Sequence, residues 1–232
     1  DDFVCFIDFA ATFLDVAGVK GRGTMQPITG KTLRPIFQSA KAGQVDPKRD
    51  HVLIGKERHD IGRPKDAGYP IRGIVKGKYL YLKNYEPTRW PIGNPETGFR
   101  NTDNSPTKSE CLKGRSNQDL AQYYAMNFGK RPPEELYRID TDSECIQNLA
   151  DDPKLTELKS QLKAEMEAQL RAEGDPRMFG KGAIFDNYPY GRANKRGYYE
   201  AYLKRKAKAE AHPTTKGKKP KKKSKSKPAS KQ

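Results

Sequence analysis

The stretch Ile71-Arg-Gly-Ile-Val-Lys-Gly-Lys-Tyr-Leu-Tyr-Leu-Lys-Asn-Tyr85 carries the pattern that decides the fold. Two runs rich in β-branched and aromatic residues, 71–75 and 78–85, flank Lys76-Gly77, which suits a tight turn. In the second run leucine alternates with tyrosine, which is typical of a strand that is contacted on both faces. The stretch therefore predicts a β-hairpin.

Two further strands and a helix extend this hairpin into a domain. Residues 51–56 and 134–140 read as short strands. Asp152-Pro153 supplies an N-cap residue followed by a proline at the first helical position, and Gly174 ends the pattern. The helix between them carries one apolar stripe: Leu155, Leu158, Leu162, Met166 and Leu170. We expect an α+β fold, with a small antiparallel sheet of about four strands and a packed C-terminal helix.

The N-terminal segment has a different character. Residues 3–17 have apolar side chains at helical spacing almost all round, with Gly18 as a stop signal, so this helix should be buried. The residues after Gly18 offer no obvious partner surface, and we expect that partner in a larger protein of which this chain is a piece. A short second helix is predicted from Leu33 to Ser39. Residues 86–118 are rich in Pro, Gly, Asn and Ser and predict a long loop.

The positive charge is concentrated at the C-terminal end. Residues 204–232 hold thirteen Lys or Arg against one Glu, a net charge of +12, so residues 1–203 account for +4 of the total of +16. Such a lysine-rich segment cannot bury enough apolar surface to offset the entropy of ordering, and we predict a disordered tail over 204–232. It either solubilises the protein or attracts a polyanion such as nucleic acid or a sulfated polysaccharide.

Other partners and sites are limited by composition. No stretch approaches the roughly 18 apolar residues that a membrane span needs. The spacing of Cys5, Cys111 and Cys145 fits no zinc site. Cys5 is expected to be a buried thiol, whereas pairing of Cys111 with Cys145 stays open. The oligomeric state is not predicted.

The best candidate site is Glu57-Arg58-His59-Asp60, directly after the first predicted strand. Loops at strand ends are positioned by a rigid scaffold. Arg58 and His59 offer donors for an anionic oxygen, and His59 can move a proton with Asp60 to orient it. A surface ion-pair cluster is the alternative. Of the other histidines, His51 is expected to be structural and His212 falls in the predicted tail.

A complete catalytic set is missing from the sequence. It has no glycine-rich phosphate loop, no nucleophile elbow and no histidine pair at metal-ligand spacing. Asp140-Thr141-Asp142 lacks the glycine and distal glutamate of a calcium loop and is expected to form a turn.

Several segments, in order along residues 1–180, resemble the sulfatase family, especially bacterial proteins similar to heparan N-sulfatase (N-sulfoglucosamine sulfohydrolase). Residues 6–18 resemble the family helix D-x-A-P-T-x-L-x-x-A-G, with Ala11 in place of proline. Residues 29–33 resemble the turn that comes after it. Glu57-Arg58-His59-Asp60, 69–72 and 79–82 resemble the start of the C-terminal subdomain. Residues 134–137 with 148–150 resemble E-L-Y-D…D-P-x-E-x-x-N-L-A, with Ser143 in place of proline.

The resemblance implies a domain organisation and a position for the catalytic residues. Residues 1–48 would end an α/β catalytic domain, 49–203 would form the C-terminal α+β subdomain, and 204–232 would be the tail. The family's formylglycine nucleophile and its calcium ligands would lie upstream, so that this segment has no catalytic or metal-binding residue and is inactive alone. Cys111 and Arg115 have the spacing of the family's nucleophile motif, but Lys113 replaces the required proline, and we reject them.

The resemblance also implies a substrate and a location. It predicts a periplasmic or secreted hydrolase of sulfate esters or N-sulfate groups, acting on a sulfated saccharide. Arg58, His59 and Arg72 would approach the sugar pocket, with Arg58 and His59 contacting substrate and Asp60 in support. The alternatives are a non-enzymatic basic protein that binds nucleic acid through its tail, or a polysaccharide-binding module without catalysis.

Overall fold

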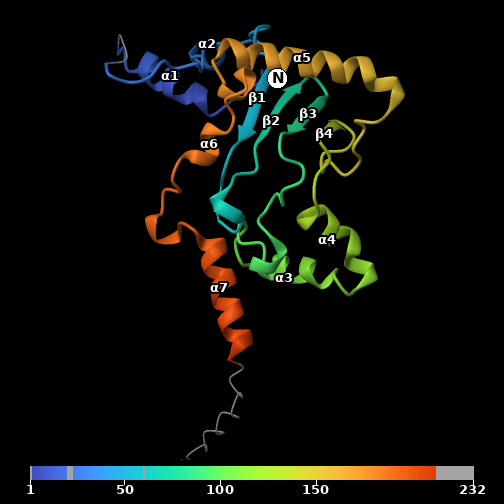
Figure 1. Ribbon diagram of the computed structural model, residues 1–232. Coiled ribbons are helices and arrows are strands. Elements are labelled where there is room, and N and C mark those ends of the chain that lie inside the picture. The colour runs from blue at the N-terminus through green and yellow to red at the C-terminus, as the bar shows by residue number, and fades with distance from the viewer. Residues whose placement is uncertain (1, 20–22, 60, 213–232) are drawn as a thin grey trace, which may run out of the picture.

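The hairpin of residues 71–85 lies at the centre of a four-stranded antiparallel sheet (Figure 1). A computed structural model of the chain describes residues 2–19, 23–59 and 61–212. The strands lie side by side in the order β1-β2-β3-β4, and each pairs antiparallel with the next. Their bounds are β1 His51–Lys56, β2 Ile71–Lys76, β3 Tyr79–Asn84 and β4 Glu134–Arg138. The predicted α+β class and the four strands are confirmed.

The predicted turn is present, but it lies one residue later than the predicted Lys76-Gly77. Lys76 pairs with Tyr79, which leaves Gly77 and Lys78 as a two-residue loop. Gly77 has a φ of 54°, a left-handed conformation that glycine adopts without steric cost. The fourth strand is shorter than predicted because the chain turns after Arg138, where the backbone N–H of Asp142 donates to the Arg138 carbonyl at 2.9 Å.

Helix α5 (Thr156–Ala172) covers one face of the sheet (Figure 1). The predicted stripe faces inward: Leu162, Met166 and Leu170 are buried, and Leu155 and Leu158 are partly buried against the same cluster. Each buried side chain of this size contributes about 1.5–3 kcal/mol relative to its exposed state. From the strands this core receives Ile74, Tyr81 and Leu136, all with no exposed surface.

The segment predicted as a long loop contains a helix. The bounds of the other helices are α1 Ile7–Val16, α2 Arg34–Phe37, α3 Pro106–Lys113, α4 Ala121–Phe128, α6 Ile184–Asn187 and α7 Tyr198–Ala211. Helix α3 starts because the Ser105 side chain accepts from the Lys108 backbone N–H and Pro106 is the first helical residue. The loop prediction for 86–118 is therefore wrong at α3.

The boundary of the predicted tail also needs correction. Helix α7 continues through residues 204–211, which the sequence placed in a disordered segment. Alanine, lysine, arginine and glutamate are strong helix formers, and these residues are helical despite their charge. Residues 213–232 lie outside the described part of the chain.

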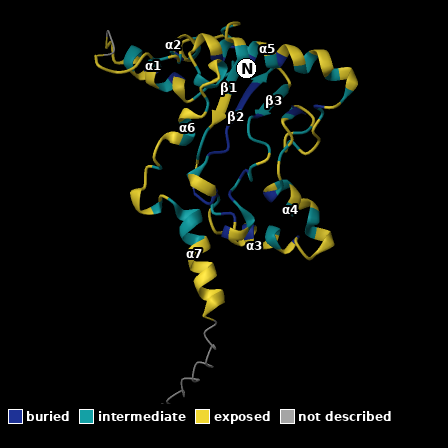
Figure 2. Cartoon of the chain, in the orientation of Figure 1, coloured by how far each residue is buried: buried dark blue, intermediate teal, exposed yellow. Residues whose placement is uncertain are grey.

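Helix α1 forms as predicted, but its burial is opposite to the prediction. Its buried residues are Asp8 and Thr12, whereas Phe6, just before it, is 87% exposed and Phe13 is 69% exposed (Figure 2). Polar contacts, rather than apolar packing, attach this helix to the loop after it. In the described part of the chain, no helix is both long and apolar enough to cross a membrane.

Candidate functional site

The candidate residues lie at one end of the sheet, where β1 ends, β2 begins and β3 ends: Arg58 and His59 in the loop after β1, and Arg72 in β2. The loop 57–70 joins β1 to β2 and packs on residues 85–101, which come after β3. Two backbone hydrogen bonds join these loops: the Asn94 N–H donates to the Gly62 carbonyl at 2.8 Å, and the Tyr85 N–H donates to the Pro70 carbonyl at 3.1 Å. The sheet thereby fixes both loops that could line a binding site.

His59 is an exposed residue of the first of these loops. Its Nδ1 lies 3.1 Å from Oδ1 of Asn101, a buried residue of the second loop. This contact sets the orientation of the imidazole ring and ties it to a segment 42 positions away. Asp60, predicted to support His59, lies outside the described residues. Asn101 was missed by the sequence analysis because nothing local to the 86–118 segment marks it.

Arg58 is held by backbone carbonyls and by an aromatic ring. Its guanidinium donates to the carbonyl of Asp66 at 3.0 Å and to that of Tyr188 at 2.8 Å. It also lies 5.6 Å from the centre of the Tyr190 ring. These contacts join the 57–70 loop to the segment before α7. They also fix the position of the Arg58 guanidinium.

Arg72 forms part of a buried charge network. It is 8% exposed, and its guanidinium donates to Asp175 Oδ2 at 2.5 Å and to Glu57 Oε1 at 2.6 Å. Arg177 binds the same Glu57 carboxylate through two hydrogen bonds. Desolvation lowers the pKa of Arg72, but the hydrogen bonds and charges of Asp175 and Glu57 outweigh it and raise the pKa. These contacts fix the Arg72 guanidinium beneath the loop.

A cavity of about 600 Å³ lies beside these loops. Trp90 and Arg89 form part of its wall, together with Asp186, which pairs with Arg89 at 2.9 Å. Arg63, 1% exposed, also lines it, and its three guanidinium nitrogens donate to the carbonyls of Trp90, Ala67 and Pro91. Sequence reasoning gave no sign of this cavity, because its residues come from three separate segments.

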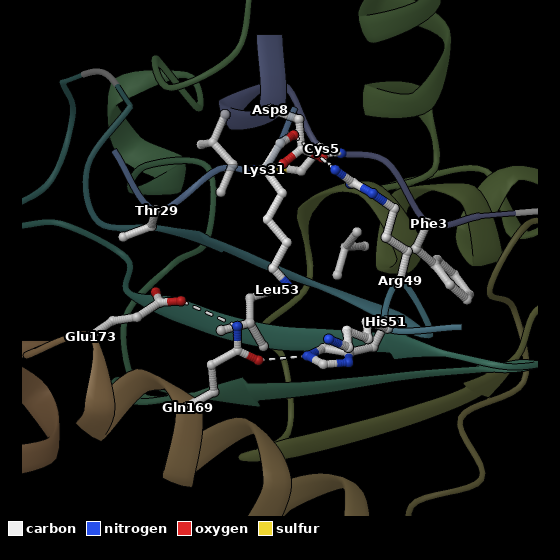
Figure 3. Close-up of a pocket in the computed structure, with 13 residues that line it drawn as sticks. Phe3, Cys5, Asp8, Thr29, Lys31, Arg49, His51, Leu53, Gln169 and Glu173 are labelled. Atoms are coloured by element: carbon white, nitrogen blue, oxygen red, sulfur yellow. Dashed lines mark hydrogen bonds and ion pairs between the residues drawn. The ribbon is translucent and has the colours of Figure 1, made fainter. Parts of the chain in front are cut away.

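A second, smaller pocket of about 110 Å³ lies between the N-terminal segment, the start of β1 and α5 (Figure 3). His51 lines it, with Nε2 2.5 Å from Gln169 Oε1 of α5 and Nδ1 2.7 Å from Asp50 Oδ1. The Lys31 side chain points from the opposite wall into this pocket (Figure 3). His51 ties β1 to α5, in agreement with a structural role.

One group of side chains in the described part of the chain could gather around a metal ion. Ligand atoms of Asp50, His51 and Glu165 lie within 4.8 Å of one another. The Lys76 ammonium already bridges the two carboxylates, at 3.0 Å from Asp50 and 2.6 Å from Glu165. Calcium prefers six to eight oxygen ligands, so this cluster of two carboxylates, an imidazole and a lysine does not suit it.

The three cysteines are free and half-buried in the structure. Cys5, just before α1, is only partly buried, so the prediction of a buried thiol is wrong. Cys111 belongs to α3, and Asn127 of α4 is 3.7 Å from its sulfur. Cys145 lies in the turn after β4 with a φ of 53°. The structure therefore does not pair Cys111 with Cys145.

Comparison with known proteins relates this chain to sulfatases. Over 180 residues it is 27% identical to the ulvan-active sulfatase of Formosa agariphila, a match that covers 74% of this chain and 26% of that protein. The chain resembles part of a sulfatase. It spans about a quarter of the length of the relatives that it matches. No protein-family model matches it.

Three solved structures are similar over 73% of the chain, with low identity. One was solved in complex with its substrate D-glucosamine-2-N,6-O-disulfate and matches with a TM-score of 0.43 at 16% identity, over 24% of its length. The others are a putative sulfatase from Bacteroides thetaiotaomicron VPI-5482 and a 2-O GAG sulfatase, each with a TM-score of 0.41 at 18% identity, over 25% of its length. The relation to sulfatases therefore rests on the sequence.

Proposed function

We propose that this chain forms the C-terminal portion of a glycan sulfatase and supplies residues that bind the sulfated saccharide. The observation that carries the proposal is the 180-residue sequence similarity to a sulfatase. In this proposal residues 1–48 end the catalytic domain and 49–203 form the C-terminal subdomain. The formylglycine nucleophile and the calcium ligands would belong to another part of the enzyme, which would be periplasmic or secreted.

The loop geometry supports a substrate-binding role for Arg58 and His59. His59 is exposed and its ring is oriented by Asn101, while the guanidinium of Arg58, the preceding residue, is held by two carbonyls. Preorganised donors of this kind suit an anionic sulfate, because little side-chain entropy is lost when the ligand binds. A sulfate ester and an N-sulfate present the same oxygens to such donors, and the proposal includes both.

The test compares two histidine variants in the protein expressed with any sequence that precedes Asp1. His59→Ala should lower kcat/KM for a sulfated glucosamine by about tenfold or more, since a hydrogen bond to a charged group is worth about 1.5–3 kcal/mol. His212→Ala, at the end of α7, is the matched control and should leave sulfate release unchanged. Unchanged turnover of every sulfated sugar by His59→Ala would contradict the site assignment.

The activity itself is tested by the same preparation. Release of sulfate from ulvan or from a glycosaminoglycan supports the sulfatase assignment. Retention of polysaccharides on the protein without sulfate release supports a binding module, and salt-sensitive retention of nucleic acid alone supports the basic-protein alternative. The 232-residue chain by itself should release no sulfate from these substrates.

A further inference from the structure

The face of the sheet opposite α5 carries a cavity of about 460 Å³. Because side chains alternate between the faces of a strand, Ile71, Leu80 and Leu82 point away from the core and line this cavity. Met126 of α4 and Ile146, in the turn after β4, contribute further apolar surface. The floor and part of the wall are therefore hydrocarbon.

Positive groups gather at one side of this cavity. Lys56, the last residue of β1, and Arg131, just before β4, both line it. Tyr69 lines it as well, and its ring lies 5.8 Å from the Lys56 ammonium and 5.9 Å from the Arg63 guanidinium. Within the part of the chain that the structure describes, Lys56, Arg63 and Arg131 form no salt bridge.

This positive charge is partly removed from water. Although the Lys56 side chain is exposed overall, desolvation of its ammonium, with the nearby charges of Arg63 and Arg131, lowers its pKa. Burial lowers the pKa of Arg63 to about 10. Desolvated cations without a counter-ion raise the free energy of the folded chain, and an anion bound beside them would lower it.

Two carboxylates also line the cavity, Glu135 and Glu144. Glu144, in the turn after β4, is exposed to solvent, and Glu135 is occupied by other donors. Glu135, 5% exposed, accepts from Asn84 at 2.7 Å and from the Tyr137 hydroxyl at 2.5 Å. The Tyr69 hydroxyl, by contrast, is buried and has no hydrogen-bond partner among the described residues. Burial raises the pKa of Tyr69 to about 12, so the hydroxyl keeps its proton and remains a donor at neutral pH.

We propose that this cavity binds a small organic oxyanion, a carboxylate or sulfate-type group carried on an apolar body about the size of one six-membered ring. The anionic oxygens would lie at Lys56, Arg131 and the Tyr69 hydroxyl, and the body would lie on Ile71, Leu80 and Leu82. The cavity includes neither Arg58 nor His59. The proposal does not depend on the chain being part of a sulfatase.

Three probes separate the contributions of charge and of the apolar body. Benzenesulfonate carries both, benzenesulfonamide has a similar shape without the charge, and inorganic sulfate is an anion without the ring. Titration of the ¹⁵N-labelled 232-residue chain should show saturable shifts for benzenesulfonate in the amides of Lys56, Leu80 and Leu82. Benzenesulfonamide and inorganic sulfate should each bind at least about tenfold more weakly than benzenesulfonate, because each lacks one of the two sets of contacts.

The variants test the residues individually. Lys56→Gln and Arg131→Gln should each weaken benzenesulfonate binding by about tenfold, as expected for loss of a charged hydrogen bond. Lys83→Gln is the matched control: Lys83 is also a strand lysine near a tyrosine ring, 5.2 Å from that of Tyr85, but it pairs with Glu167 of α5 on the other face. Its affinity should equal that of the unchanged chain.

Tyr69→Phe tests the site without destabilising the fold. It removes a buried hydroxyl that has no partner, so the thermal midpoint of the free chain should stay equal or rise. Its affinity for benzenesulfonate should nevertheless fall. The proposal is overturned if benzenesulfonate does not bind or if the sulfonamide binds as tightly. Equal binding of inorganic sulfate would overturn the role of the apolar floor, and equal losses for Lys83→Gln and Lys56→Gln would overturn the location.

Discussion

Helices α1 and α5 present opposite kinds of side chain to the rest of the molecule. Helix α5 buries Leu162, Met166 and Leu170 against the sheet and leaves its polar residues outside. Helix α1 buries Asp8 and Thr12 and leaves Phe13 69% exposed. Both helices have an apolar side, but only that of α5 has a surface in the described chain to pack against.

The contacts explain how α1 is held in place. The Asp8 carboxylate accepts from the Cys5 and Lys31 backbone N–H groups and pairs with Arg49 at 2.8 Å. The Thr12 hydroxyl accepts from the Leu33 N–H at 2.9 Å. The difference between the helices shows that hydrogen bonds can fix the position of a helix whose apolar side stays exposed. Helix α5, by contrast, is held by the burial of apolar surface.

The largest expected effect comes from breaking the polar attachment of α1. Asp8→Ala leaves the Arg49 guanidinium, 5% exposed, with only its longer ion pair to Asp46 at 3.9 Å, and should destabilise the N-terminal segment by about 3–5 kcal/mol. Hydrogen exchange of the Leu33 amide reports on this segment, because that amide donates to Thr12 rather than to the mutated residue. Its protection should fall strongly.

The same helix contains a control for this prediction. Asp15 pairs with Arg34 at 3.3 Å, and both side chains are more than a third exposed. Asp15→Ala should change the stability by less than about 1 kcal/mol, as is usual for surface pairs. Equal protection of Leu33 in the Asp8 variant and the unchanged chain would show that apolar contacts hold α1, and the contrast with α5 would fail.

The next largest effect tests the apolar attachment of α5. Met166 has no exposed surface and lies within the core cluster, so Met166→Ala should lower the free energy of unfolding by about 2–5 kcal/mol. Gln161→Ala, at an exposed position of the same helix, should leave it within about 0.5 kcal/mol. Urea unfolding followed by circular dichroism measures both. A small loss for Met166→Ala would place the main stabilisation elsewhere.

Much of the sheet and α5 was predictable because the signals are local. Alternation in residues 78–85, the Gly77 turn and the stripe from Leu155 to Leu170 each specify an element from neighbouring residues alone. The burial of α1 was not predictable in this way, since a hydrophobic pattern shows which side would be buried but not whether a partner is present. Helix α3 was missed because its Ser-Pro start lies in a segment whose composition favours loops.

The candidate site likewise combines residues that local sequence signals predict with partners that they do not. The position of Arg58 and His59 after a strand was readable from the sequence, and the structure places both at the end of the sheet. Their partners Asn101, Asp66 and Tyr188 were not readable, because they lie 42, 8 and 130 positions away and carry no pattern of their own. The same holds for the Arg72 network, which joins Glu57 to Asp175.

A smaller, pH-dependent effect is expected at the polar margin of α5. Glu134 of β4 accepts from Tyr81 at 2.7 Å and from Lys163 of α5 at 2.9 Å. Desolvation would raise the pKa of Glu134, but the hydrogen bonds from Tyr81 and Lys163 and the charges of Lys163 and Lys159 lower it to about 2. A carboxyl group whose pKa is lowered on folding stabilises the protein at pH values above its ordinary pKa of 4.5. This stabilisation is lost as the pH falls toward 2.

The matching variant isolates this contribution from the other carboxyl groups. Glu134→Gln should cost about 1 kcal/mol near neutral pH, a modest value because the side chain is 26% exposed and solvent screens the pairs. The difference in free energy of unfolding between the variant and the unchanged chain should shrink between pH 5 and pH 2, because Glu134 becomes protonated over this range. A pH-independent difference in urea unfolding would show that the ion pairs of this margin do not contribute.

The smallest effect on stability is expected on the exposed side of α1, and there solubility is the sharper readout. The rings of Phe6, Phe9 and Phe13 stack with centroid distances of 5.8 and 6.0 Å, and Phe13 is 69% exposed. Phe13→Gln should therefore change the free energy of unfolding by no more than about 0.5 kcal/mol, while Phe99→Ala, at a ring with no exposed surface, should cost about 3–5 kcal/mol. Because a contiguous exposed apolar side promotes association, sedimentation velocity should show less self-association for Phe13→Gln than for the unchanged chain. A large loss of stability in Phe13→Gln would mean that the aromatic side of α1 is packed within the chain, and α1 and α5 would then be attached by the same kind of contact.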